Sequence, residues 1–182
     1  VLFTADGYCY GGKTLDSIGR IAGILESLPS VTCVVVVANV SPRPDLARLP
    51  AARHYEEFGG PDATLRFERL PFDHPLYILY SSGTTGVPKC IVHGAGGTLL
   101  QHLKEHQLHS DVHPGERLFF FTTCGWMMWN WLASALASQA TVVLFDGSPF
   151  HPDDGVLWRL ASEERVAIFG TSPKYLAALE KS

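Results

Sequence analysis

The sequence predicts an α/β fold in which a mainly parallel β-sheet is flanked by helices. Short apolar runs typical of buried strands recur along the chain, and segments with apolar residues at helical spacing separate them. The 182 residues, 46% of them hydrophobic and 18% charged, have a typical globular composition. A chain of this length suits one domain or a large part of one, with a proper core.

Residues 1–40 predict a β-α-β unit. Residues 1–4 form an apolar strand, and residues 33–38 read Cys-Val-Val-Val-Val-Ala, a continuous apolar run typical of a buried parallel strand. Between them, apolar residues recur at helical spacing from Ile18 to Leu28, with Thr14 or Asp16 as the expected cap and Pro29 as the end.

Residues 41–76 predict an irregular excursion. Prolines and glycines interrupt every pattern in this segment, charged residues are dense, and only a short helix near residues 51–58 is expected. Long loops of this kind usually wrap a surface or join subdomains. The segment carries no motif that indicates chemistry.

The third region, residues 77–182, predicts strands that alternate with helices. The expected strands are residues 77–80, 90–93, 118–123, 141–145 and 166–170. The expected helices are residues 98–109, 126–138, 153–164 and 173–181. This order is typical of a parallel sheet.

Charge and cysteine content argue against a nucleic-acid-binding, membrane-bound, disulfide-stabilised or metal-binding protein. A net charge of −4 gives no support for a nucleic-acid or membrane-surface partner. Because no long uncharged apolar run and no leader segment is present, a cytoplasmic protein is expected, and its oligomeric state is left open. The cysteines Cys9, Cys33, Cys90 and Cys124 form no CxxC pair, so we expect small buried apolar residues rather than metal ligands or disulfides.

The most informative motif is residues 80–89, Tyr-Ser-Ser-Gly-Thr-Thr-Gly-Val-Pro-Lys. Glycines allow close backbone approach, hydroxyls donate to phosphate oxygens and lysine supplies charge, so the segment suits a polyphosphate loop. A P-loop NTPase is disfavoured because Val and Pro, not Lys and Ser/Thr, follow Gly86. Residues 94–97 do not complete a dinucleotide-binding pattern. A simple Ser/Thr/Gly turn is the alternative.

This loop resembles the signature loop of the adenylate-forming superfamily, which includes acyl-CoA synthetases and nonribosomal-peptide adenylation domains. Residues 90–106 and 123–131, the second reading Thr-Cys-Gly-Trp-Met-Met-Trp-Asn-Trp, resemble its acetoacetate–CoA ligase branch. The likeness covers essentially the whole chain and is strongest over residues 76–149. It implies part of an N-terminal adenylation domain and an ATP-dependent ligation of acetoacetate to CoA through an acyl-adenylate.

Other functions stay open at this point. A ligase for acetate, propionate or butyrate would carry the same loop, and so would a non-catalytic nucleotide- or CoA-binding module. The resemblance implies small-molecule partners, with ATP, Mg²⁺ and CoA as substrates or cofactor of a complete enzyme. Family members are several times longer, and their Mg²⁺-binding glutamate, ribose-binding aspartate and C-terminal lid domain have no counterpart here. We therefore expect a partial chain that is inactive alone, without an assigned catalytic residue.

The resemblance implies a phosphate site in the loop. Its residues are Ser81, Ser82, Gly83, Thr84, Thr85, Gly86 and Lys89. Backbone and hydroxyl donors of residues 82–86 would hold the β- and γ-phosphates of ATP. Lys89 either reaches a phosphate or anchors the loop.

The resemblance also implies an acyl pocket and a CoA tunnel. The acyl pocket is expected at Met127, Met128 and Asn130, where methionine adapts to the acyl chain and the amide can donate to a 3-keto oxygen. The CoA tunnel is expected at Trp126 and Ser172. Ordinary core packing is the alternative for the Trp/Met segment, and a plain helix cap is the alternative for Ser172.

The histidines allow two readings. His102, His106 and His109, which we call the histidine stripe, share one face of a predicted helix. Neither an HExxH motif nor a third-ligand pattern accompanies them, so a solvated or partner-facing polar surface is predicted rather than a metal site. His93 is expected near the phosphate or adenylate.

Overall fold

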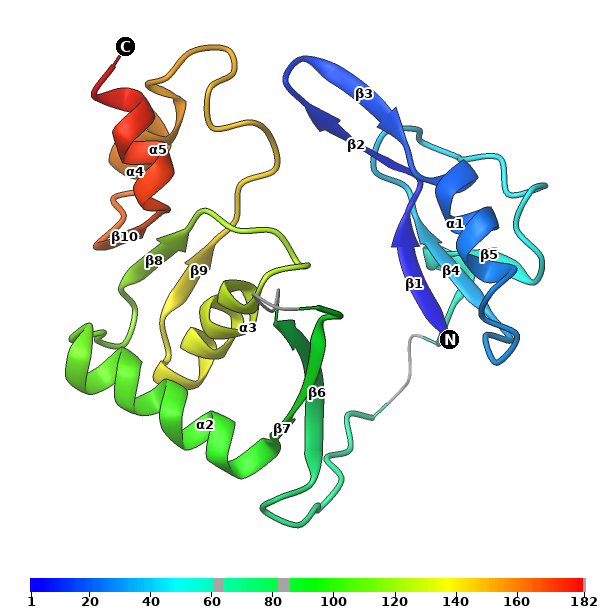
Figure 1. Ribbon diagram of the computed structural model, residues 1–182, viewed down its shortest axis with the longest axis horizontal. Helices are drawn as coiled ribbons and strands as arrows, with labels where there is room; N and C mark the ends of the chain where they lie inside the picture. Colours follow the sequence, from blue (N-terminus) through cyan, green and yellow to red (C-terminus); the bar gives the residue numbers. More distant parts are fainter. Residues whose placement is uncertain (61–63, 82–85, 182) are drawn as a thin grey trace. The chain divides into compact units, whose positions relative to one another are not determined.

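The computed structural model describes residues 1–60, 64–81 and 86–181 (Figure 1). The chain divides into two compact units. The first unit consists of Val1–Arg66 and Asp146–Asp153, and the second consists of Phe67–Phe145 and Asp154–Ser182. The boundaries drawn from the sequence after residues 40 and 76 stay predictions.

The first unit contains a parallel sheet with the strand order β1-β4-β5. Strands β1 (Leu2–Ala5) and β4 (Val34–Val37) are joined by helix α1 (Ile18–Leu25), and β5 (Ala52–His54) pairs with β4. Strands β1 and β4 are parallel, with α1 between them, and the extent of the predicted β-α-β unit, residues 1–40, stays a prediction. Val34 and Val36 are fully buried against Ile18 of α1. The Asp16 carboxylate accepts hydrogen bonds from the first amides of α1, as expected of a cap.

Two strands of the first unit were not predicted individually. Strands β2 (Gly7–Tyr10) and β3 (Lys13–Asp16) form an antiparallel hairpin that turns at Gly11 and Gly12, whose φ angles are 57° and 74°. A Gly-Gly pair between two short runs is typical of such a hairpin, so the signal was present in the sequence.

The helix expected near residues 51–58 is only a 3₁₀ turn, η1 (Tyr55–Glu57), and the strand β5 precedes it. A three-residue strand that contains Arg53 and His54 has no apolar pattern to reveal it. Its pairing with the buried β4 creates it.

Asp6 is buried where β1 meets the hairpin. Its carboxylate accepts hydrogen bonds from the amides of Asn39, Val40 and Ser41 at 2.7, 3.1 and 2.8 Å. Burial raises the pKa of this carboxyl, but the backbone donors outweigh burial and hold the pKa below its ordinary value. The buried charge therefore fixes the segment that follows β4.

The second unit contains a parallel sheet with the strand order β10-β8-β9. Its strands are β8 (Arg117–Phe120), β9 (Thr141–Val143) and β10 (Ile168–Gly170). Leu118 and Phe119 alternate along β8 and belong to separate core clusters, so both faces of the sheet are covered. Helix α3 (Met127–Ser134), continued by the 3₁₀ turn η3 (Ala135–Ser138), covers the Leu118 face. Helices α4 (Val156–Glu163) and α5 (Pro173–Leu179) cover the other.

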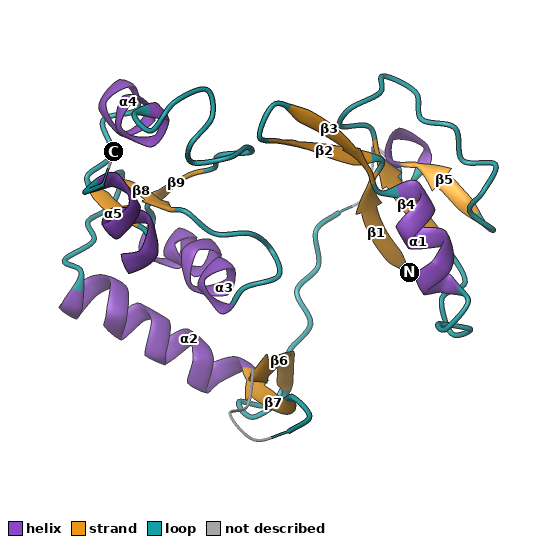
Figure 2. Ribbon diagram, turned by 45° about the horizontal axis from the view of Figure 1, so that its top comes forward, coloured by secondary structure: helices purple, strands orange, loops and turns teal. Residues whose placement is uncertain are grey.

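An antiparallel hairpin and a long helix complete this unit. Strands β6 (Pro75–Ser81) and β7 (Lys89–Gly94) pair with each other, and β7 leads directly into α2 (Ala95–Lys104), as Figure 2 shows. Helix α2 continues as one π-helical segment, η2 (Glu105–His109). The predicted α/β class, with parallel sheets flanked by helices, is confirmed.

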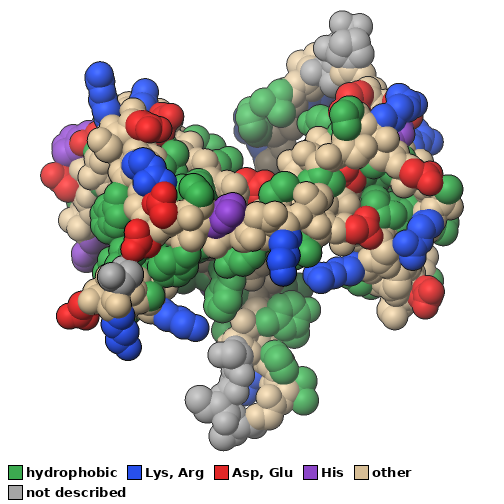
Figure 3. Space-filling view, turned by 90° about the horizontal axis from the view of Figure 1, so that it is seen from above, with side chains coloured by type: hydrophobic (Ala, Val, Ile, Leu, Met, Phe, Trp, Pro, Cys, Tyr) green, Lys and Arg blue, Asp and Glu red, His purple; other side chains and the backbone are tan. Residues whose placement is uncertain are grey.

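The expectation that the cysteines are buried is wrong. Cys9, Cys90 and Cys124 are exposed, and Cys33 is half-buried. Cys9 and Cys90 lie on two-stranded hairpins, which leave side chains uncovered, and Cys124 lies in the loop before α3. Hydrophobic side chains are also exposed among charged ones on the face drawn in Figure 3. Among the described residues, no helix is both long enough and apolar enough to cross a membrane.

Candidate functional site

The predicted phosphate loop connects the paired ends of the β6–β7 hairpin. Ser81 and Lys89 are opposite each other in the strand register, so the two ends of the loop lie side by side. Residues 82–85, which include the predicted Ser82, Gly83, Thr84 and Thr85, lie outside the described residues. Gly86 has a φ of 129°, a conformation that favours glycine.

The side chain of Lys89 is exposed, and no hydrogen bond or ion pair joins it to another described residue. This arrangement leaves its ammonium group available to an anion. Both roles considered for Lys89 stay predictions.

A cavity of about 940 Å³ lies between the hairpin, α2, β8 and α3. Its volume is near the upper end of the range of about 300–1,000 Å³ that is usual for small-molecule sites. Six apolar side chains of its lining, which we call the apolar side, are Phe72, Val92, Phe120, Met127, Met128 and Trp131.

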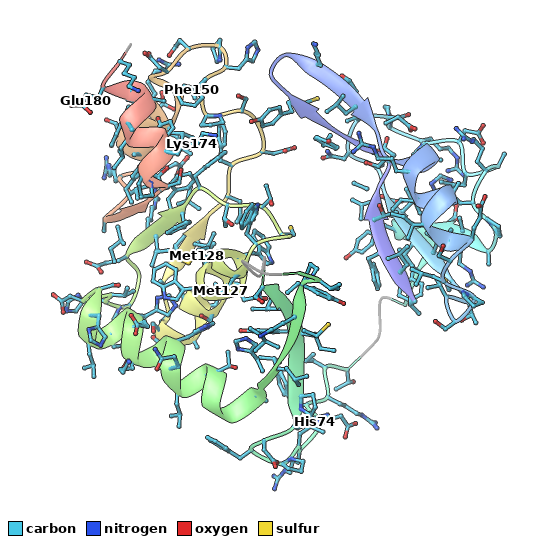
Figure 4. All side chains as sticks on the ribbon, in the orientation of Figure 1. His74, Met127, Met128, Phe150, Lys174 and Glu180 are labelled. Atoms are coloured by element: carbon cyan, nitrogen blue, oxygen red, sulfur yellow. The ribbon has the colours of Figure 1, made fainter. Side chains whose placement is uncertain are left out.

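Helix α3 supplies the methionines of the apolar side. Met127 and Met128 lie in its first turn (Figure 4). Trp131 follows one turn later and lines the same cavity. The structure thus brings the two predicted acyl-pocket methionines to one cavity. Asn130 is half-buried and does not line the cavity, and Trp126 is 70% exposed at the residue before α3. The roles of Met127, Met128 and Asn130 in an acyl pocket, and of Trp126 in a CoA tunnel, stay predictions.

The loop before β6 also reaches the cavity, although the sequence indicated no chemistry in that segment. The carbonyl of Phe72 accepts a hydrogen bond from the Gly96 amide at 2.8 Å, and that of His74 accepts one from Ala95. These bonds attach the loop to the start of α2. A Cβ at residue 96 would collide with the Phe72 ring, so glycine is required for this approach. Phe72 and Asp73 therefore line the cavity through contacts that no sequence pattern reveals.

The polar side chains of the lining, which we call the polar side, are Asp73, His93, Thr98, Gln101, His102 and Glu105. Four of them recur on one face of α2 and its continuation, at spacings of three, one and three residues. Gln101 Nε2 donates to Glu105 Oε1 at 2.9 Å, and Lys104 Nζ lies 3.3 Å from the same carboxylate oxygen.

His93 lies on β7 and packs against Tyr77 of β6, with ring centroids 5.2 Å apart. The Tyr77 side chain is hydrogen-bonded to Thr98 of α2, and burial raises the pKa of its phenol. The hairpin and α2 are therefore linked beside the cavity. The expected position of His93 near the adenylate stays a prediction.

His106 is fully buried behind the cavity, with an exposed fraction of 0%. Its Nε2 lies 2.9 Å from the Trp131 carbonyl oxygen and 3.1 Å from Ser134 Oγ. Because a carbonyl oxygen only accepts, Nε2 carries the proton in this contact. Burial lowers the pKa of His106, although the Trp131 carbonyl and Glu105 oppose this effect. The ring is therefore neutral.

The prediction that the histidine stripe is a solvated surface is wrong for His106. His109 is exposed and His102 is half-buried, so the three rings do not share one environment. The prediction assumed a regular α-helix, whereas the chain becomes π-helical at Glu105, with the Ser110 amide bonded to the Glu105 carbonyl at 2.9 Å. An added residue in the turn rotates the following side chains away from the α-helical face.

His102 lies between the cavity and His106, with the two histidine ring centroids 6.4 Å apart. Burial lowers its pKa, and the charges that His106 and His93 would carry lower it further, whereas Glu105 raises it. The imidazole is therefore neutral at pH 7 and presents one donor and one acceptor. The sequence placed His102 on one face of a helix, but this pattern alone predicted a solvated or partner-facing surface rather than a cavity.

Ser172 caps helix α5. Its hydroxyl accepts a hydrogen bond from the Tyr175 amide at 3.2 Å. Ser172 therefore acts as a helix cap, which was the alternative considered for this residue. A contact between Ser172 and CoA stays a prediction. No group of three or more His, Cys, Asp or Glu in the described part of the chain is arranged to hold a metal ion, so we assign none of these residues to Mg²⁺.

Comparisons with known proteins identify the family. A family model described as AMP-binding enzyme matches residues 1–182, and the chain therefore belongs to this family. The chain is 54% identical to an acetoacetyl-coenzyme A synthetase of Rhizobium meliloti (strain 1021) and 47% identical to the malonamoyl-CoA synthetase vrtB of Penicillium aethiopicum. Each match covers 100% of this chain and 28% of the relative.

A solved structure agrees with these matches. The acetoacetyl-CoA synthetase from Streptomyces lividans superimposes with a TM-score of 0.89 at 44% identity, over 99% of this chain and 27% of that one. The resemblance to acyl-CoA synthetases predicted from the loop is confirmed. The chain spans a little over a quarter of the length of these relatives.

Proposed function

We propose that this chain is the phosphate-loop and acyl-pocket region of an ATP-dependent ligase that joins acetoacetate to CoA. The observation that carries the proposal is the continuity of the site. The predicted loop ends in β7, β7 leads into α2, and α2 faces the two methionines of α3 across one cavity. The identity of 54% to an acetoacetyl-CoA synthetase supports acetoacetate as the acid.

The relatives' names narrow the chemical class of the acid. Acetoacetyl and malonamoyl groups differ at their far end, which is a methyl group in one and an amino group in the other. Both have a carbonyl on the third carbon. The apolar side of the cavity suits the short chain, and its polar side offers hydrogen bonds to that carbonyl.

The reaction proceeds in two displacements. A carboxylate oxygen of the acid attacks the α-phosphorus of ATP, the bond to the bridging oxygen breaks, and pyrophosphate leaves. The thiol sulfur of CoA then attacks the acyl carbon, loses its proton, and AMP leaves. Negative charge develops on the pyrophosphate in the first step, so donors and a lysine around the phosphates lower the barrier.

In this scheme Lys89 and the loop hold the phosphates, while the cavity holds the acyl chain. Mg²⁺ would accompany ATP and neutralise part of its charge. Ser172 and Trp126 would contact CoA. The two displacements of this scheme need no covalent nucleophile from the protein.

The test is ATP–pyrophosphate exchange with the complete protein that carries this chain. We expect exchange that depends on acetoacetate, followed by formation of acetoacetyl-CoA and AMP when CoA is added. Faster exchange with acetate, propionate or butyrate would instead identify a ligase for another short acid. Binding of ATP without exchange for any of these acids would identify a non-catalytic binding module.

A further inference from the structure

We propose that His102 is a specificity-determining residue that donates a hydrogen bond to the carbonyl oxygen on the third carbon of the acyl substrate. This inference rests on the proposed function, because it assumes that the cavity holds the acyl chain. It assigns the selection of 3-oxo acids to a side chain of α2 rather than to the residues of α3.

The other polar side chains of the cavity are ionised or held by neighbouring residues. Asp73 and Glu105 are acids, which cannot donate when ionised and which repel a carboxylate substrate. The Gln101 amide is oriented by its hydrogen bond to Glu105, and the Thr98 hydroxyl by its hydrogen bond to Tyr77, so neither group turns freely toward a ligand. A carbonyl oxygen needs a donor that is free to turn toward it.

The two histidines of the cavity differ in their surroundings. The ring of His93 packs on Tyr77 and lies on the strand that begins at Lys89, next to the phosphate loop. The ring of His102 makes an edge contact with His106 and has no hydrogen bond to any other described residue. His102 is also half-buried, so a substrate that fills the cavity without pairing with it leaves a polar group unpaired.

The layer behind His102 keeps the ring in place and uncharged. Nε2 of His106 donates a hydrogen bond to the Trp131 carbonyl oxygen of α3 at 2.9 Å. The ring of His106 also packs on the Trp131 ring, with centroids 4.3 Å apart. Trp131 in turn lines the cavity. Burial beside these rings lowers the pKa of His102, so the ring faces the substrate as a neutral donor.

The experiment measures kcat/KM for acid-dependent ATP–pyrophosphate exchange in the complete protein. Acetoacetate and malonamate carry the carbonyl, and butyrate has the same chain length as acetoacetate but lacks it. We expect His102→Phe to lower kcat/KM for both 3-oxo acids by about 10–100-fold, mainly through KM, and for butyrate by less than about threefold. His102→Gln keeps an N–H donor and should restore part of the preference.

His109→Phe is the matched control, because this exposed histidine follows on the same helix and does not line the cavity. This substitution should leave kcat/KM for acetoacetate, malonamate and butyrate unchanged. Equal losses for all three acids in both His102 variants would show a structural role and overturn the proposal, and so would no loss at all. Discrimination that depends on His93 instead would also overturn it. If the wild-type protein activates neither 3-oxo acid, the proposed function fails before His102 is tested.

Discussion

The two units of the chain bury polar side chains in different ways. In the first unit, the carboxylate of Asp6 is matched by three backbone amides. In the second unit, Nδ1 of the buried His106 has no hydrogen-bond partner among the described residues. His102, beside it, borders a cavity. A satisfied buried group holds the fold, whereas a side chain such as His102, which borders a cavity and has no hydrogen bond to another described residue, leaves hydrogen-bonding capacity for a ligand.

The largest effect on activity is expected for a substitution of Lys89, which lies at the end of the predicted phosphate loop in the second unit. In the complete protein, Lys89→Ala should lower kcat/KM for acetoacetate-dependent exchange by about 100-fold, because the charge on the departing pyrophosphate loses a partner. Lys13→Ala is the control, since Lys13 is an exposed lysine on β3 of the first unit. Unchanged turnover together with unchanged ATP affinity would remove Lys89 from the phosphate site.

Asp6→Asn should affect stability rather than chemistry. Loss of the charge that three amides share should lower the free energy of unfolding by about 2–3 kcal/mol, measured by urea denaturation of the complete protein. Asp45→Asn is the matched control because exposed Asp45 accepts a single bond from the Ala47 amide. Activity per folded molecule should stay at the wild-type level.

The pH dependence of Asp6 has a defined sign. Its pKa is lower in the folded than in the unfolded state, so the stabilisation is complete above the unfolded value of about 3.9 and disappears as the pH falls through the folded value. Asp6→Asn should remove this acid-sensitive part. An unfolding free energy that falls equally steeply in both proteins at low pH would contradict this role.

The sequence predicted β1, α1 and β4 of the first unit better than the cavity, for physical reasons. The run of valines in β4 fixes a buried strand locally, and the spacing from Ile18 onward fixes α1. The predicted methionines of α3 do meet at the cavity. Phe72 and His106, however, reach their positions through a loop bonded to the start of α2 and a π-helical turn. Neither feature has a periodic pattern, so sequence alone could not place them.

The size of the cavity should control which acids are accepted. Met128→Trp fills space opposite α2, and we expect it to lower kcat/KM for acetoacetate about 10-fold more than for acetate, since the longer chain needs that volume. Leu176→Trp, at an exposed position of α5, is the control. An equal effect on both acids would mean that Met128 does not contact the acyl chain.

The smallest expected effect is the titration of His106. Its pKa is lower in the folded state, so the unfolded chain binds the proton first and stability falls as the pH drops below about 6.5, by at most about 1.4 kcal/mol per pH unit. His102 shifts in the same direction and contributes in the same range. Unfolding measured between pH 5 and 8 should show a shallower slope for His106→Gln, whereas His109→Gln should keep the wild-type slope.

The central claim is that the cavity between α2 and α3 holds the acyl group. The most direct measurement is a crystal structure of the complete protein with a non-hydrolysable analogue of acetoacetyl-adenylate. We predict that the methyl end lies against Met127 and Met128, with the carbonyl of the third carbon within hydrogen-bond distance of a ring nitrogen of His102. An analogue whose acyl chain lies outside this cavity would contradict the claim.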